Sequence, residues 1–288
     1  MTNQNHPASL LVASTAICAA LFAVGAYATA YIPSPWGFGQ FRPAVVIPAL
    51  FGAIFGPLPA AIGAALGTLI ADSIKHQSLY MGSLLAAVPG NFIGFFIFGY
   101  ILKKKFNWAR FIAASVTTLV IGNLITAFLY IFLFKAFYTQ ALVLSPDSLT
   151  YLSIGLTIYW FATMLPFMLL ITPPLIRAVA SAMPSIVPES LRIHSLKSEM
   201  PEMSLSLAMT VPGIIMTLVG FATSYTTLGE LTLAAVKSET VLTMVELMYY
   251  LSGAALLIIG LATLYKGKMK RHEEVQHGWS RRNFRRTS

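Results

Sequence analysis

Long runs of apolar residues alternate with short polar stretches along this chain of 288 residues. The runs are continuous, and several reach the roughly 20 residues with which a helix crosses a bilayer. Such a helix pairs every backbone N–H and C=O internally, as the hydrocarbon core requires. The pattern predicts eight membrane segments, at residues 9–31, 36–56, 58–74, 83–102, 108–134, 150–176, 204–226 and 243–265.

Composition also favours an all-α, polytopic membrane bundle. Hydrophobic residues make up 57% of the chain and charged residues 10%, whereas a soluble domain carries roughly 25% charged residues. So few charges cannot cover a water-facing surface. The alternation typical of strands in a membrane β-barrel is not seen either.

The segments group into four parts. The first six, with the boundaries of the second and third left open, form a core, and a polar, proline-containing linker separates them from a final pair. Residues 43–74 are compatible with two short spans or with one hairpin that re-enters from outside. The predicted parts are a core at 1–180, a cytoplasmic linker at 181–203, a transmembrane pair at 204–266 and a basic cytoplasmic tail at 267–288.

The distribution of Lys and Arg predicts that both termini lie in the cytoplasm. The chain has 19 Lys and Arg residues and a formal charge of +9. If the N-terminus is inside, only Arg42, Lys75, Lys135 and Lys237 fall on outer segments. The excess of basic residues inside is the bias that orients membrane proteins. Topology therefore explains the positive charge, and we expect no nucleic acid as a partner.

Motifs give no support for an enzyme. The sequence contains no G-x-x-x-x-G-K-[ST], no H-E-x-x-H and no G-x-S-x-G. It has one cysteine, Cys18, and its His, Asp and Glu residues do not cluster at ligand spacing. We therefore expect no catalytic role, no bound metal and no cofactor.

Polar and aromatic residues at membrane depth point to a binding site instead. Counted from the outer ends of their helices at ~1.5 Å per residue, Asn91 lies ~12 Å deep, Asn123 ~16 Å, and Tyr159 and Trp160 ~14 Å. Amides can donate and accept hydrogen bonds, and aromatic rings can stack on a flat ligand. This layer suits a small heteroaromatic solute.

Further candidates lie above this layer, towards the outside. Trp36 and Gln40 belong to the loop after the first segment, Arg42 opens the second and Asp72 closes the third. All these residues also have simpler interpretations, since amides link helices, aromatic residues fill space or anchor the interface, and Arg42 can pair with Asp72.

The first segment carries small residues on one side. Ala16, Ala20 and Ala23 would let another helix approach closely. That helix could belong to the chain itself or to a separate membrane subunit.

Three stretches resemble the substrate-binding S components of energy-coupling-factor (ECF) transporters. Residues 41–57 (FRPAVVIPALFGAIFGP) resemble the second segment of that family, 61–72 (AIGAALGTLIAD) the third, and 89–95 (PGNFIGF) the fourth. The order and spacing of the three stretches are more specific for the family than any single glycine-rich stretch. The resemblance covers roughly residues 9–180.

The resemblance implies a subunit that binds a vitamin-like molecule or a metal ion near the outer face. It would dock onto a membrane T subunit and cytoplasmic ATPases, which would hydrolyse the ATP. Without a cluster of metal ligands, we expect the vitamin-like class. By analogy, Ala16, Ala20 and Ala23 would face the T subunit. The pocket would be lined or rimmed by Arg42, Asp72, Asn91, Asn123 and Trp160. The final pair and the basic tail depart from the family pattern.

Two alternatives remain. A stand-alone ion-coupled carrier would want a titratable group in mid-membrane, whereas Asp72 and Glu246 sit near segment ends. A membrane assembly or scaffold protein would act through its linker and tail and would tolerate changes at Asn91.

Overall fold

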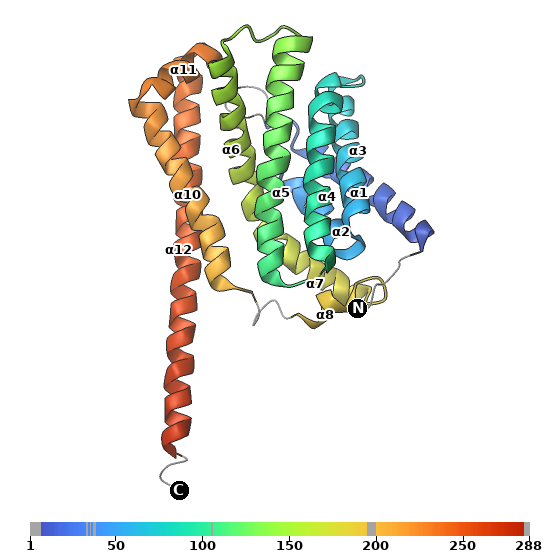
Figure 1. The fold of residues 1–288 in the computed structure, drawn as a ribbon, viewed down its shortest axis with the longest axis vertical. Coiled ribbons are helices and arrows are strands. Elements are labelled where there is room, and N and C mark those ends of the chain that lie inside the picture. Colours follow the sequence, from blue (N-terminus) through green and yellow to red (C-terminus); the bar gives the residue numbers. More distant parts are fainter. Residues whose placement is uncertain are drawn as a thin grey trace.

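A computed structural model describes residues 7–32, 34, 36, 39–104, 106–194 and 200–284. In this part of the chain, seven helices are long and apolar enough to cross a membrane. The all-α membrane bundle is thereby confirmed (Figure 1). Among the described residues, seven of the eight expected segments contain such a helix, whereas the second contains a shorter apolar helical stretch, Pro43–Phe55. At ~1.5 Å per residue this stretch is ~20 Å long, well short of a ~30 Å hydrocarbon core.

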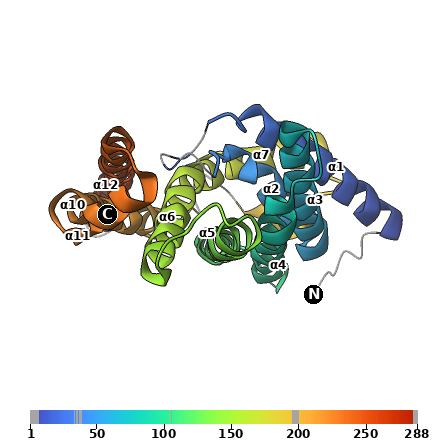
Figure 2. The ribbon, with the colours of Figure 1, turned by 90° about the horizontal axis from the view of Figure 1, so that it is seen from above.

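The core places its helices side by side (Figures 1 and 2). Two of them are extended by π-helical turns (η2 and η3), and α2 is preceded by one 3₁₀ turn (η1). The elements are α1 (Ala8–Ala28), η1 (Pro43–Val45), α2 (Val46–Phe55), α3 (Pro57–His76), η2 (Ser83–Ala87), α4 (Val88–Lys104), α5 (Trp108–Phe128), η3 (Leu129–Tyr138), α6 (Pro146–Leu170) and α7 (Thr172–Ala182).

Residues 43–74 form two helices of unequal length. Helix α3, with 20 residues, is a full span, whereas α2, with 10 residues, covers only part of the depth. The chain turns between them at Gly56, whose φ of 89° favours glycine. We call the described residues between Thr29 and Arg42 (29–32, 34, 36 and 39–42) the cavity loop, which leads to α2. At its end, the Gln40 carbonyl accepts a hydrogen bond from Trp160 of α6 at 3.0 Å.

Small residues explain the close packing of α1 on α3. A Cβ atom at Gly63 would lie 2.5 Å from Cys18 Sγ, and one at Gly67 would lie 2.7 Å from the carbonyl oxygen of Ala19. Cys18 is fully buried in this contact. The interface therefore depends on glycine, as is common where membrane helices approach closely.

The final helices form a hairpin that packs on the α6 side of the core. It consists of α10 (Glu202–Tyr225), the short α11 (Thr227–Val236) and α12 (Glu239–Phe284). The backbones of α10 and α12 touch where Gly213 faces Gly253, since a Cβ at Gly213 would lie 3.0 Å from the Gly253 carbonyl. Seen from above, the hairpin and α1 lie at opposite ends of the bundle (Figure 2).

The expected linker and tail boundaries differ from the helices of the structure. Within residues 181–203, the short helix α8 (Glu189–Ile193) interrupts the linker, and residues 195–199 lie outside the described part. The predicted boundary between 266 and 267 falls inside α12, which continues to Phe284 well beyond the bundle (Figure 1). Residues 285–288 of the predicted tail are outside the described residues.

Candidate functional site

A cavity of about 210 Å³ lies in the core, where the last turns of α3 and the η3 turns supply part of its wall. The cavity loop, α1, α3, η2, α4, α5, η3 and α6 all contribute to its wall. The polar, charged and aromatic side chains of the lining, together with one methionine, include Gln40, Arg42, Asp72, Lys75, His76, Tyr80, Ser83, Asn91, Asn123, Tyr130, Lys135, Trp160 and Met164.

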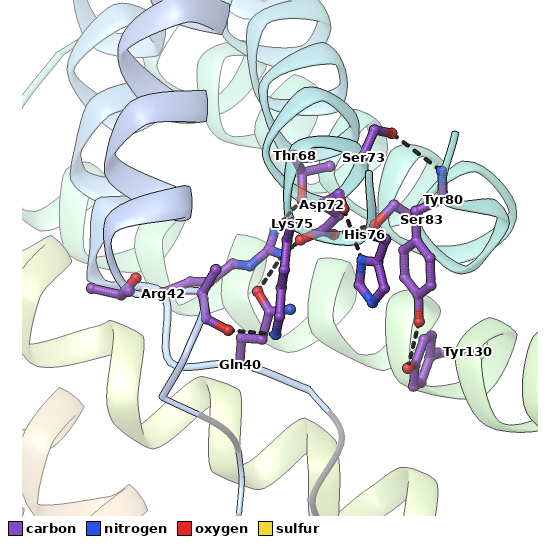
Figure 3. A network of polar contacts seen from close by, with 12 residues as sticks. Gln40, Arg42, Thr68, Asp72, Ser73, Lys75, His76, Tyr80, Ser83 and Tyr130 are labelled. Carbon is purple, nitrogen blue, oxygen red and sulfur yellow. Dashed lines mark hydrogen bonds and ion pairs between the residues drawn. The ribbon is translucent and has the colours of Figure 1, made fainter. Parts of the chain in front are cut away.

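Arg42 and Asp72 form a buried ion pair that joins the cavity loop to α3 (Figure 3). Their side chains are 11% and 5% exposed. Arg42 also donates to Thr68 and, at 3.1 Å, to Gln40, while Ser83 donates to the other carboxylate oxygen of Asp72. Because both charges are satisfied within the chain, this network fixes one wall of the cavity.

A second wall is aromatic. The rings of His76 and Tyr80 stack with centroids 3.8 Å apart and an interplanar angle of 3°. The hydroxyl groups of Tyr80 and Tyr130 lie 3.0 Å apart, within hydrogen-bonding distance (Figure 3). Burial raises the pKa of Tyr80, so its phenol stays neutral at physiological pH. This wall therefore offers flat apolar faces with neutral hydroxyl groups.

The charge around the cavity is predominantly positive. Its lining contains Arg42, Lys75 and Lys135, but Asp72 is the one acid among the described lining residues. Lys75 donates to the Ala30 carbonyl at 2.6 Å, and Lys135 Nζ lies 5.6 Å from the centre of the Tyr130 ring. This excess of positive charge disfavours the binding of a cationic ligand.

Two amides face the cavity with spare hydrogen-bonding capacity. Asn91 of α4 lines it and forms no side-chain hydrogen bond with the part of the chain that the structure describes. Asn123 of α5 makes only a long contact, 3.8 Å from its Nδ2 to the sulfur of Met164. An amide at membrane depth without a partner is costly unless a ligand or water completes it.

The structure brings together six of the eight residues that the sequence suggested for binding. The six around the cavity are Gln40, Arg42, Asp72, Asn91, Asn123 and Trp160. Trp36 and Tyr159 do not line it. Trp36, in the cavity loop, instead packs against Tyr159 of α6, with ring centroids 6.4 Å apart. Tyr159 precedes Trp160 on the same helix, and neighbours one position apart point in different directions.

Several lining residues were missed by the sequence analysis. Tyr80 and Ser83 lie just after the third segment, and Tyr130 and Lys135 on the η3 turns that extend the fifth. These residues lie near helix ends, outside the mid-membrane positions at which polar side chains indicate a site. The spacing of Tyr130 seven residues after Asn123, which returns to the same helix face, was the available signal.

The small-residue surface of α1 is divided between two faces. Ala16 and Ala20 are exposed, but Ala23 is only 6% exposed and packs inside the bundle. Ala23 is therefore corrected from a docking residue to a packing residue, because α1 turns it towards its own core. Ala16 and Ala20 stay candidates for contact with another subunit.

Comparison with known families identifies the core. The family model for the S component of the ECF-type riboflavin transporter matches residues 9–180, more than half of the chain. The chain belongs to this family. It is therefore a membrane-embedded substrate-binding subunit of an ECF-type transporter, and the cavity lies wholly within the matched region. Comparisons with curated proteins and with solved structures gave no match.

Proposed function

We propose that this S component binds riboflavin, or a closely related flavin, in the cavity and delivers it to an ATP-driven importer. The observation that carries the proposal is the cavity itself. Within the region that matches the riboflavin family, it combines a stacked aromatic wall with the amide of Asn91, which has no hydrogen-bond partner among the described residues.

The chemistry of the lining supports a flavin over other vitamins. The isoalloxazine ring system is flat and carries carbonyl and N–H groups, which match aromatic faces and amides. The cavity is smaller than the ~300–1,000 Å³ typical of drug-sized ligands, so we expect side chains or the cavity loop to shift when a whole flavin enters. The surplus of positive charge disfavours a cationic vitamin such as thiamine.

The partners belong to the same proposal. We expect the exposed face of α1 at Ala16 and Ala20 to dock onto a membrane T subunit, and cytoplasmic ATPases to provide the energy. Both termini would lie in the cytoplasm and the protein would reside in the cell membrane. The hairpin of α10 and α12 leaves this face open, because it packs at the other end of the bundle (Figure 2).

The structure weakens the alternative of a stand-alone ion-coupled carrier. Such a carrier needs a titratable group that can change its charge in the pathway. Asp72 is the only acid among the lining residues that the structure describes, and it is held by Arg42 and Ser83.

The test is to identify and titrate the ligand. The protein is purified in detergent, its bound molecules are released by denaturation and identified by mass spectrometry, and riboflavin affinity is measured by quenching of flavin fluorescence. We expect a flavin at near-equal molar ratio. Asn91→Leu should weaken binding at least ~10-fold, since the flavin then loses a buried polar partner.

Phe92→Leu is the matched control, because Phe92 is the neighbouring residue and is 37% exposed on the outside of α4. It should bind riboflavin as the wild type does. The proposal fails if the protein neither releases a flavin nor binds riboflavin, or if it prefers thiamine.

A further inference from the structure

Trp36 connects the cavity loop to the C-terminal hairpin. Its ring makes edge-to-face contacts with Tyr159 of α6 and with Tyr249 of α12, both at 6.4 Å between centroids. Trp36 is 8% exposed and Tyr249 3%. At Gly155 of α6, an added Cβ would lie 3.0 Å from the Trp36 ring and 3.3 Å from the Tyr249 hydroxyl. The absence of a side chain there lets both rings reach the same place.

The cavity loop connects Trp36 with the wall of the cavity. Backbone hydrogen bonds of 2.9 Å run from Ser34 to the carbonyl of Gly39 and from Phe41 to that of Ile32, and they close the loop around Trp36. Gly39 lies directly on α6, since a Cβ there would come within 2.7 Å of Leu156. The next residues along the loop, from Gln40 to Arg42, enter the wall of the cavity.

Tyr249 and its neighbour Tyr250 have separate surroundings. Tyr249 faces the core and forms no hydrogen bond through its hydroxyl to any described residue, so its contribution is the packing of its ring. Tyr250 stays within the hairpin, where it donates to Ser224 at 3.1 Å and packs on Phe221 with centroids 5.4 Å apart. The two tyrosines therefore form a matched pair for experiment.

We propose that Tyr249 is a positioning residue for substrate binding: by clamping Trp36 against α6, the C-terminal hairpin holds the cavity loop closed and slows release of the ligand. The hairpin lies outside the residues that match the family, so this chain has added a support for the loop to the common core. The proposal rests on the proposed function for the nature of the ligand, but the position of the loop can be tested without one.

The first experiment measures opening of the loop in the empty protein. Ser34, 1% exposed, is replaced by cysteine in a Cys18→Ala background, and the rate of labelling by a water-soluble maleimide is followed. We expect Tyr249→Ala to raise the rate about 3- to 10-fold, the range for loss of one buried aromatic contact. Tyr249→Phe, which keeps the ring, and Tyr250→Ala should label at the rate of the parent.

The second experiment measures riboflavin dissociation by stopped-flow fluorescence in the full-length protein. Tyr249→Ala should release riboflavin about 3- to 10-fold faster, and Tyr249→Phe and Tyr250→Ala at the parental rate. Gly155→Ala, which pushes on both rings, should reproduce the effect of Tyr249→Ala.

The outcomes separate the two proposals. If the parent protein binds no flavin, the proposed function fails, and the labelling rates alone decide the role of Tyr249. Equal labelling rates for Tyr249→Ala and Tyr250→Ala would overturn the positioning role, since a general loosening of the hairpin would then account for both. Faster labelling of Tyr249→Ala with rescue by phenylalanine would support it.

Discussion

The pair of Arg42 and Asp72 shows how individual residues shape this site. Both line the cavity, yet their charges are taken up by each other and by Thr68, Gln40 and Ser83. A charge left alone in a buried site is costly, whereas a satisfied pair holds two chain segments in place. We interpret the pair as a structural ion pair that holds the cavity loop against α3. Ligand recognition is assigned to Asn91 and the aromatic wall.

Removing one member of this pair should be worse than removing both. We expect Asp72→Ala to reduce the free energy of unfolding by about 3 kcal/mol, because Arg42 is left buried without its partner. The double variant Arg42→Met with Asp72→Leu should recover most of that loss. Apparent melting temperatures of the purified variants in detergent provide the measurement.

The exposed Asp147, in the first turn of α6, provides the control for the pair. Asp147→Ala should change the melting temperature little, as is usual for exposed positions. If the decreases in melting temperature were additive in the double variant, Arg42 and Asp72 would contribute independently. That result would contradict the structural role of the ion pair.

Among the helices, α1 has two faces with different tasks. Cys18, Ala19 and Phe22 pack against the glycines of α3, while Ala16 and Ala20 face away from the bundle. A small-residue patch that the chain itself leaves uncovered suits the close approach of another membrane helix. The face is thus available for a T subunit without any rearrangement of the hairpin.

Enlarging this patch should separate binding from transport. We expect Ala16→Leu combined with Ala20→Leu to reduce riboflavin uptake at least ~10-fold in cells that also express the T subunit and ATPases, because leucine side chains keep the partner helix at a distance. Riboflavin affinity of the purified variant should stay unchanged, since the patch lies outside the cavity.

The same substitution at Ala28, an exposed residue near the end of α1, is the control and should leave uptake intact. Normal uptake by the Ala16→Leu and Ala20→Leu variant would place the docking face elsewhere on the molecule.

At the scale of the whole molecule, a family core is joined to an additional hairpin. The core, within residues 9–180, contains the cavity and the α1 face. The hairpin contacts the core through α6 and through Trp36, and α12 extends far beyond the end of the bundle (Figure 1). Lys266, Lys268, Lys270 and Arg271 belong to the second half of α12, and an excess of basic residues is typical of cytoplasmic segments.

The orientation can be tested with fusions at the C-terminus. Green fluorescent protein folds on the cytoplasmic side, so we expect its fusion to fluoresce, and a fusion to alkaline phosphatase to be inactive. A phosphatase fusion after Gln140, in the connection between η3 and α6, should be active. The reverse pattern would invert the topology and place the cavity on the cytoplasmic side.

The sequence alone determined the membrane class, the helical architecture and most of the layer of polar residues. Apolar runs of about 20 residues have only one stable form in lipid, so local composition is sufficient to predict them. Counting along straight helices predicted a common layer for Asn91, Asn123 and Trp160, and all three line the cavity. The resemblance of three short stretches to S components predicted the family, which the match over residues 9–180 confirmed.

Only the tertiary structure decided which of these residues meet. The short α2, the cavity loop and the inward turn of Ala23 depend on the rotation and tilt of helices, which packing between neighbours sets. Trp36 and Tyr159 were expected at the pocket, but they pack against each other and do not line the cavity. The contact between Trp36 and Tyr249 joins residues more than 200 positions apart, and hydropathy, a local property of the chain, contains no information about such a pairing.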